Sequence, residues 1–232
     1  MRPFLKIIAG LAAGLLALQS AQSWAAPKEN WTAKVSVQAD GTHVLGNPDA
    51  KLQLTEFVSY TCPLCGAFQR SADAPLRLAY VMPGTLSVRI QQVVRNPVDL
   101  AVALLIGCGN PAGYFKRHQI FLHKQDSWLA RLDSMSSAQK SRWSAGNVAS
   151  GLRAISADFG FYQIMDHLNY SRSAVDRCLG DMQTAEKLMA QSADAELLGI
   201  QGTPSFTLNG KLLENTHDWN TLNAAIISRM QP

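Results

Sequence analysis

The sequence has no large excess of either charge and no apolar run that reaches the length of a bilayer. Its 21 basic and 17 acidic residues give a formal net charge of +4. So small an excess argues against nucleic acid or an anionic membrane as the partner. The apolar run near the N-terminus, residues 7–18, is shorter than the ~20 residues that a membrane-spanning helix needs. We therefore expect neither a nucleic-acid-binding nor a membrane-spanning protein.

The N-terminus has the pattern of a secretory signal peptide. Arg2 and Lys6 come before the apolar run, and residues 23–25 (Ser-Trp-Ala) offer a small-x-small cleavage site. We expect residues 1–25 to be cleaved rather than kept as an anchor. Removing Arg2 and Lys6 with this segment lowers the basic count from 21 to 19, against 17 acidic residues. The sequence thus predicts an exported protein of the bacterial periplasm, where disulfides can form.

The first part of the mature chain alternates strand, helix and strand. Residues 26–41 are polar and without a clear period, so they are predicted to form an N-terminal arm, in which Val35 and Val37 could form a short strand. Residues 52–59 predict a strand buried on both faces. The helical period of residues 63–80 and the alternation of residues 86–94 then predict a helix and a second strand.

A long helical block follows. Asn96 is a suitable N-cap, Pro97 suits the first helical position, and Asp99 suits the positive end of a helix. No strand is expected from there to about Ser192, and the Ser-rich segment 134–141 is expected to be a break. The predicted helices cover 98–108, 112–123, 126–134, 147–158, 173–179 and 184–198.

Two further features of this block concern its side chains. We expect the basic cluster 116–118 to lie on a solvated helix face. A set of aromatic side chains is expected to form the core of the block rather than a substrate groove. These residues are Tyr114, Phe115, Phe121, Trp128, Phe159, Phe161 and Tyr162.

The chain ends with strand character again and a final helix. Asn209-Gly210 between two apolar runs predicts a hairpin, and residues 218–230 predict an amphipathic helix. We therefore predict an α/β protein with a thioredoxin-like fold and an inserted all-helical domain. Its predicted parts are the arm 26–41, the thioredoxin-like domain 42–96 and 199–232, and the helical domain 97–198.

Cysteine is scarce as well, with four residues in the chain, and two of them, Cys62 and Cys65, form a CxxC pair. A structural zinc site needs four ligands. His118 and His123 lie far along the chain, and five positions on a helix place them about 140° apart around its axis. They do not converge on the pair, so neither a metal site nor a cofactor is predicted.

The position of the pair favours redox chemistry over a structural staple. A Cys62–Cys65 disulfide would close a very short loop and remove little entropy from the unfolded chain. The N-terminus of a helix, by contrast, stabilises a thiolate through its free N–H groups and its dipole. We expect Cys62 to be the exposed, attacking sulfur and Cys65, one turn further on, to resolve the intermediate.

Two further positions are candidate site residues. Glu56 lies on the predicted buried strand, where its carboxylate could exchange a proton with Cys65; the alternative is a solvated glutamate. Pro204 follows Thr203 at the start of a strand. A cis peptide bond there would present the Thr203 backbone beside the dithiol, ready to pair with an extended substrate. The alternative is a trans proline that begins a strand.

The other two cysteines, Cys108 and Cys178, stand far apart in apolar helical contexts. If Cys62 and Cys65 pair with each other, one partner choice remains for them. We predict a structural disulfide inside the helical domain. Two separately buried thiols are the alternative.

Two motifs of this sequence resemble the DsbA family of periplasmic thiol–disulfide oxidoreductases. They are "EFVSYTCPLCGAFQ" at 56–69 and "GIQGTPSFTLNGK" at 199–211. The resemblance extends over nearly the whole mature chain, and it implies a thioredoxin fold with an inserted helical domain. It also implies reduced exported proteins as substrates, a membrane quinone-linked thiol oxidase as the recycling partner, and a monomer.

The resemblance also implies a role for each matching residue. Cys62 is expected to be the nucleophile, Cys65 the resolving thiol, Glu56 the buried carboxylate and Pro204 the cis-proline. The sequence departs from the oxidising members at Leu64, where they carry histidine.

Disulfide donation is the first expectation, because the N-terminal arm is too short for the dimerisation domain that isomerases use. The alternatives are a disulfide reductase or isomerase, and a metal chaperone whose dithiol binds copper. Thr203 before the proline resembles the isomerase branch.

Overall fold

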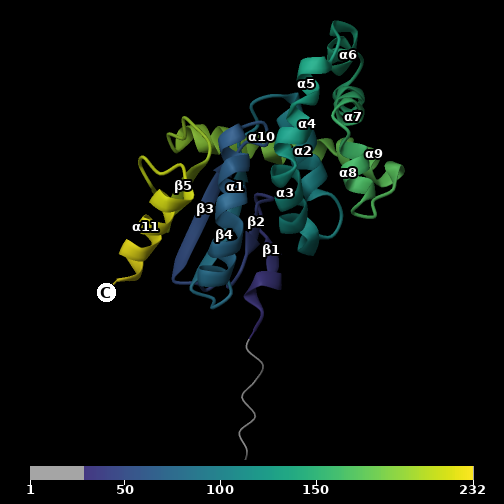
Figure 1. Cartoon of the computed structure of the whole chain (residues 1–232). Helices are drawn as coiled ribbons and strands as arrows, with labels where there is room; N and C mark the ends of the chain where they lie inside the picture. The colour runs from purple at the N-terminus through teal and green to yellow at the C-terminus, as the bar shows by residue number, and fades with distance from the viewer. Residues whose placement is uncertain (1–28, 232) are drawn as a thin grey trace, which may run out of the picture.

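A six-stranded mixed sheet forms the centre of the structure, a computed structural model that describes residues 29–231 (Figure 1). The strand order is β1-β2-β4-β3-β5-β6. The predicted signal peptide, 1–25, lies outside the described residues. The strands are β1 (Val35–Val37), β2 (His43–Leu45), β3 (Leu52–Val58), β4 (Leu86–Gln92), β5 (Ser205–Leu208) and β6 (Lys211–Leu212).

The two central strands are joined by the predicted crossover helix. β3 pairs in parallel with β4, and antiparallel with β5 on its other side. Between β3 and β4 runs α1 (Pro63–Leu76), which lies over this part of the sheet in Figure 1. The helix was predicted to reach residue 80. It instead passes into a π-helical turn at Arg77–Val81, two residues after Pro75, which has no N–H to donate to the helical ladder.

Between β4 and β5 the described chain is entirely helical or irregular, as predicted. In Figure 1 most of these helices lie to the right of the sheet, whereas the last one extends back over it towards β5. They are α2 (Pro97–Gly107), α3 (Tyr114–His123), α4 (Gln125–Leu129), α5 (Arg131–Ser134), α6 (Ser137–Ser141), α7 (Val148–Asp158), α8 (Phe161–Asp166), α9 (Arg172–Leu179) and α10 (Met182–Leu197).

Two helices of this block were not predicted. The Ser-rich segment, expected to be a break, contains α6. Ser136 and Gln139 form a capping box at its start, a pattern that the sequence does contain. α8 follows Gly160, whose φ of 77° turns the chain sharply after α7.

The core of the helical block includes all of the predicted aromatic side chains, and each of them is buried. The expected solvated face at 116–118 is wrong for two of its residues, since Arg117 is 3% exposed and His118 2% exposed. The Arg117 guanidinium donates to the carbonyl oxygens of Ile106 and Asn110 and to the hydroxyl of Tyr170. These bonds satisfy the buried charge and fasten α3 to the end of α2.

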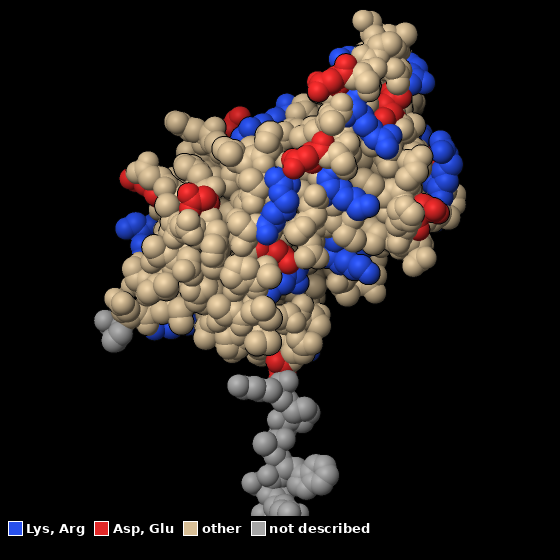
Figure 2. Space-filling view, viewed as in Figure 1, with Lys and Arg blue, Asp and Glu red and all other residues tan. Residues whose placement is uncertain are grey.

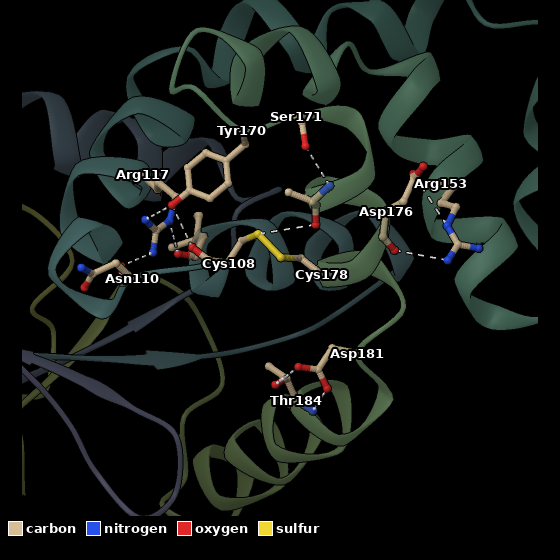
Figure 3. Close-up of a disulfide and its surroundings, with 12 residues drawn as sticks. Cys108, Asn110, Arg117, Arg153, Tyr170, Ser171, Asp176, Cys178, Asp181 and Thr184 are labelled. Atoms are coloured by element: carbon tan, nitrogen blue, oxygen red, sulfur yellow. Dashed lines mark hydrogen bonds and ion pairs between the residues drawn. A yellow bond between two sulfur atoms is a disulfide. The ribbon is translucent and has the colours of Figure 1, made fainter.

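Beside Arg117 lies a disulfide between Cys108 and Cys178, whose Cα atoms are 5.6 Å apart (Figure 3). It joins the residue that follows α2 to α9, and the Tyr170 hydroxyl donates to the Cys108 carbonyl at 3.1 Å. The bond spans a sequence separation of 70 residues. A loop of that length is worth roughly 4 kcal/mol in the chain-entropy model.

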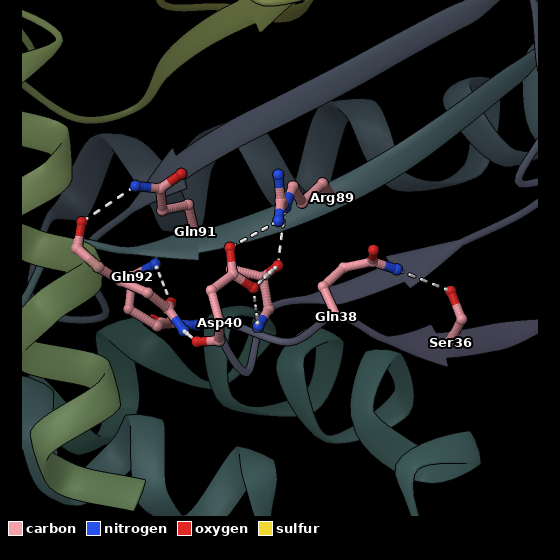
Figure 4. A network of polar contacts seen from close by, with 8 residues as sticks. Ser36, Gln38, Asp40, Arg89, Gln91 and Gln92 are labelled. Atoms are coloured by element: carbon pink, nitrogen blue, oxygen red, sulfur yellow. Dashed lines mark hydrogen bonds and ion pairs between the residues drawn. The ribbon is translucent and has the colours of Figure 1, made fainter.

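The N-terminal arm belongs to the sheet rather than lying apart from it. Its strand β1 pairs with β2, and the Asp40 carboxylate lies 2.6 Å from the Arg89 guanidinium on β4 (Figure 4). Gln191 of α10 donates to the Asp40 carbonyl and accepts from the backbone N–H of Gln92. The same contacts therefore fix α10 against β4.

The hairpin and the last helix also form as predicted. Asn209 and Gly210 both have positive φ, at 51° and 77°, which suits the primed turn of a two-residue hairpin. α11 (Trp219–Met230) begins after Asp218, whose side chain caps it. No helix among the described residues is both long and apolar enough to cross a membrane. In Figure 2, basic and acidic side chains are interspersed on the face shown, without a patch of one sign.

Candidate active site

The end of β3 and the start of α1 bring the CxxC pair to the carboxyl edge of the sheet. Cys62 is the N-cap residue of α1, Pro63 occupies the first turn, and Cys65 lies one turn in. Both are unpaired thiols. Cys65 is fully buried, and Cys62 is only 7% exposed, less accessible than predicted. The loop that contains Thr203 covers it: the Cys62 thiol donates to the Thr203 carbonyl oxygen at 3.0 Å.

The surroundings of Cys62 favour its thiolate. The largest effect is a hydrogen bond from the Cys65 side chain, which lowers the pKa of Cys62 to about 5. The Thr203 side chain and the backbone N–H groups of Cys65 and Leu64 add to the lowering, while burial opposes it. The bond to the Thr203 carbonyl is made only by the protonated thiol, so it is lost on ionisation. At neutral pH Cys62 is therefore a thiolate that accepts hydrogen bonds at the start of a helix.

Cys65 has the opposite protonation. Burial is the main cause that raises the pKa of its thiol, and the hydrogen bond to Cys62 and the charges of Cys62 and Glu56 raise it further. The pair thus holds one proton at neutral pH, and that proton is on Cys65. Two adjacent thiols whose environments separate their pKa values are suited to different steps of one reaction.

Glu56 is buried on β3, at 2% exposure, as its predicted role requires. Burial, with the charge of Asp73 as a smaller cause, raises the pKa of Glu56 to about 8. Its Oε1 atom has no hydrogen-bond partner in the structure. A cavity of about 20 Å³ lies beside it, lined also by Gln69, Asp73 and His118, and has room for one water molecule. Glu56 can therefore hold a proton at neutral pH and has a neighbouring space through which to exchange it.

Thr203 and Pro204 lie on the other side of the sulfur. The peptide bond between them is cis. β5 begins at the next residue, Ser205, and pairs with β3, which places the loop beside the N-terminus of α1. The structure thus brings together all five site residues that the sequence predicts: Glu56, Cys62, Cys65, Thr203 and Pro204.

Arg95 and Asp99 were not predicted as site residues. The Arg95 guanidinium donates to the Thr203 hydroxyl oxygen at 2.8 Å. Because that contact uses the oxygen as an acceptor, the hydroxyl proton stays available to Cys62. Asp99 is 1% exposed and accepts from the backbone N–H groups of Thr61 and Arg95 and from the Ser59 hydroxyl. Asp99 therefore ties the segment that leads into Cys62 to the backbone of Arg95, whose side chain reaches Thr203.

Gln125 of the helical block is a third site residue that the sequence did not predict. Its side-chain amide donates to the carbonyl oxygens of Tyr60, at 2.6 Å, and Cys62, at 2.8 Å. This approach needs a glycine opposite it, because a Cβ at Gly66 would lie 2.2 Å from the Gln125 Oε1 atom. The conformation of the CxxCG stretch thus depends on a side chain that lies 63 positions after Cys62 in the sequence. No sequence spacing signals this contact.

His118, considered above as a zinc ligand, instead forms hydrogen bonds with its two ring nitrogens. Its Nδ1 lies 2.9 Å from the Tyr60 hydroxyl and its Nε2 lies 3.1 Å from the Gln69 side-chain oxygen. Burial lowers the pKa of His118 to about 3, so the ring is neutral. Within residues 29–231, no three His, Cys, Asp or Glu side chains gather as metal ligands would.

Comparison with known proteins assigns the chain to a family. Residues 38–227 match the family model described as Thioredoxin. The chain belongs to the thioredoxin family. A crystal structure of protein-disulfide isomerase from Novosphingobium aromaticivorans is 41% identical, covers 84% of this chain and 100% of its own, and superposes with a TM-score of 0.80.

Two other relatives agree with this placement. A curated protein of Rickettsia bellii, named as a protein-disulfide oxidoreductase, is 27% identical over 198 residues, which are 84% of this chain and 67% of that protein. The crystal structure of alpha-DsbA1 from Wolbachia pipientis shares the fold with a TM-score of 0.63 at 20% identity, over 83% of this chain and 92% of that one. This thioredoxin-family chain is a disulfide oxidoreductase. Its fold, with the helical insertion, is similar to that of DsbA proteins.

Proposed function

We propose that the protein donates disulfides to reduced proteins exported to the periplasm, through a Cys62–Cys65 redox pair. The observation that supports this direction is the contrast between the two thiols: the pKa of Cys62 is lowered to about 5 while that of Cys65 is raised. A stabilised thiolate stabilises the reduced form of the pair. The oxidised form is then the more reactive one, so electrons flow from the substrate to this protein.

The exchange proceeds in two steps. A substrate thiolate attacks the Cys62 sulfur of the oxidised pair, the Cys62–Cys65 bond breaks, and Cys65 leaves with the electron pair and takes up a proton. A second substrate thiolate then attacks the substrate sulfur of the mixed disulfide, and Cys62 leaves as a stabilised thiolate. The substrate has lost two electrons and gained a disulfide, and this protein holds the dithiol.

The remaining site residues have positioning and proton-transfer roles in this proposal. Glu56 supplies the proton that Cys65 needs as it leaves, since its carboxyl is protonated up to about pH 8 and is buried near the pair. The backbone of Thr203 and Pro204 lies beside the sulfur. An extended substrate pairs with this backbone. A membrane quinone-linked thiol oxidase would remove the two electrons again, and the protein would act as a monomer.

The equilibrium potential of the Cys62–Cys65 couple against glutathione tests the direction. We expect a value between about −270 mV, the potential of thioredoxin, and about −120 mV, that of a strong oxidase. A value at or below the thioredoxin limit would make the protein a reductase. The purified, oxidised protein should also introduce disulfides into a reduced, unfolded substrate without added oxidant, with one disulfide formed for each pair reduced.

Isomerisation is the second candidate function, favoured by the 41% identity to a protein whose name is protein-disulfide isomerase. Refolding a substrate with scrambled disulfides separates the two functions. A donor accelerates the oxidation of the reduced substrate far more than the repair of the scrambled one, whereas an isomerase, supplied as the dithiol, accelerates the repair.

A further inference from the structure

The Pro204 carbonyl accepts a hydrogen bond from a side chain of another segment. His217 lies between β6 and α11, and its Nδ1 atom is 2.8 Å from the Pro204 carbonyl oxygen. A carbonyl oxygen can only accept, so Nδ1 carries the proton and donates it. Pro204 follows Thr203, whose own carbonyl oxygen lies 3.0 Å from the Cys62 sulfur. His217 therefore holds the residue next to the one that contacts the reacting sulfur.

The pairing of the last two strands explains the place of this bond. After β6, the backbone N–H of Leu213 donates to the Phe206 carbonyl at 2.9 Å and so extends the ladder between β5 and β6. Every second residue of a strand points its backbone groups to the same neighbour, so the next acceptor on this side is the Pro204 carbonyl. The chain turns at Asn215, whose φ is 52°. The His217 ring thus takes the place that a backbone N–H of a longer β6 would fill.

The backbone on both sides of His217 is anchored. Before it, Thr216 is 5% exposed, and its hydroxyl donates to the Glu214 carbonyl at 3.1 Å. After it, Asp218 caps α11 by accepting from the backbone N–H of Thr221 at 2.9 Å. The ring therefore extends from a fixed point, which suits a support for another loop.

We propose that His217 is a positioning residue, which holds the backbone of Thr203 and Pro204 in the geometry that an extended substrate needs. The inference rests on the proposed function, in which the substrate pairs with this backbone. A second support of the same loop is Arg95, which donates to the Thr203 hydroxyl at 2.8 Å. The two supports differ, because the Thr203 hydroxyl also serves Cys62, whereas the bond from His217 goes to backbone alone. His217 should therefore govern the pairing with substrate more than the chemistry of the dithiol.

Three variants of the full-length protein test the position of the donor. In His217→Asn the side-chain nitrogen is bonded to Cγ, as Nδ1 is in histidine, so the donor keeps its place. In His217→Gln the nitrogen lies one bond further out, and His217→Leu has no donor. The matched control is His167→Leu, the same replacement at another exposed histidine, directly after α8.

Each oxidised protein is mixed with a reduced peptide that contains two cysteines and, separately, with dithiothreitol, which has no backbone to pair with. The ratio of the two oxidation rates cancels any change in the chemistry of the Cys62–Cys65 pair. His217→Leu and His217→Gln should lower the ratio about fivefold, the factor that one ordinary hydrogen bond contributes. His217→Asn and His167→Leu should keep the ratio of the wild type. A ratio that is unchanged in His217→Leu, or equally low in His217→Asn, would overturn the proposal.

The ring of His217 gives an independent measurement. At about pH 9 an imidazole is neutral, since its ordinary pKa is roughly 6.5, and one of its two nitrogens carries the proton. Nitrogen NMR spectroscopy of the isotope-labelled protein should place that proton on Nδ1 of His217. A proton on Nε2 would overturn the proposal, because Nδ1 could not then donate to the Pro204 carbonyl. A wild-type protein that oxidises neither the peptide nor dithiothreitol would instead overturn the proposed function.

Discussion

The Cys62 sulfur and the Thr203 carbonyl oxygen lie 3.0 Å apart, although 141 positions separate the two residues in the sequence. Along the sequence, the helical block separates the first four strands of the sheet from the last two, and this contact links the segments on either side of it. It also helps to cover the sulfur, since Cys62 is only 7% exposed.

Exchanging each cysteine for serine should give different products. Cys62→Ser should abolish thiol exchange, because the thiolate with the lowered pKa is lost. Cys65→Ser should accumulate mixed disulfides with substrate proteins, because the resolving thiol is absent. Non-reducing electrophoresis after incubation with reduced substrates measures both. Adducts on Cys62→Ser but not on Cys65→Ser would invert the two roles.

Leu64 is 61% exposed between the cysteines, and its backbone N–H is among the groups that lower the pKa of Cys62. Leu64→His should lower that pKa below its present value of about 5 and make the protein a stronger oxidant, since an imidazole can hydrogen-bond to the thiolate. A thiolate absorbance titration compares the variant with the wild type, and Leu64→Gln serves as a polar control without a positive charge. An unchanged pKa in Leu64→His would show that residue 64 does not reach the sulfur.

Glu56→Gln should stabilise the protein increasingly as the pH rises from 4.5 to 8. The native carboxyl keeps its proton up to about pH 8, whereas the unfolded one loses it near its ordinary value of 4.5. In this window the wild type therefore loses up to about 1.4 kcal/mol of unfolding free energy per pH unit through this group. Glutamine has no such titration.

Urea unfolding of the reduced protein at pH 4.5 and at pH 8 measures the difference between variant and wild type. Glu214→Gln is the matched control, because it makes the same replacement at an exposed position. The same Glu56→Gln variant should exchange thiols more slowly, because Cys65 loses its proton partner. A constant stability difference across the window would mean that Glu56 ionises normally in the folded protein.

Arg95 should tune Cys62 through Thr203. Arg95→Met removes the donor to the Thr203 hydroxyl and a nearby positive charge, so it should raise the pKa of Cys62 by roughly one unit. Arg95→Lys keeps the charge and should have a smaller effect. The thiolate titration again measures the pKa of Cys62. If Arg95 had a purely structural role, that pKa would not rise in the order wild type, Arg95→Lys, Arg95→Met. Equal pKa values in all three proteins would remove Arg95 from the site.

The Cys108–Cys178 disulfide should contribute stability without taking part in exchange. The double variant Cys108→Ser, Cys178→Ser should lose roughly 4 kcal/mol of unfolding free energy, as expected for a loop of this length. Its Cys62–Cys65 potential should stay within experimental error of the wild type. A changed potential would couple the helical block to the redox pair through this bond.

The sequence predicted those parts of the site that depend on local order along the chain. Cys62 and Cys65 follow a buried strand and begin a helix, and Pro204 begins a later strand; each position can be read from its neighbours. Arg95 and Gln125 could not be found in this way, because they reach the site through tertiary contacts with backbone groups of Cys62 and Thr203's side chain. Nothing in the spacing of their neighbours signals such contacts.

The errors in the fold have similar causes. His118 lies in a basic cluster that suggests a solvated face, yet partners from other elements, Tyr60 and Gln69, satisfy it in the interior. The helix α6 is different, since its capping box at Ser136 and Gln139 was visible in the sequence and the serine content concealed it. The strand β1 was only a weak signal because its pairing with β2, rather than its own short sequence, holds it in place.

The disulfide of the helical block also has a consequence for the maturation of each newly made molecule. If the protein is exported as proposed, a new copy arrives with four thiols, and it must give up two electrons before Cys108 and Cys178 are joined. Under the proposed function a mature copy is a competent acceptor of those electrons. The protein would then be one of its own substrates, and mature copies would form the structural disulfide of newly made copies.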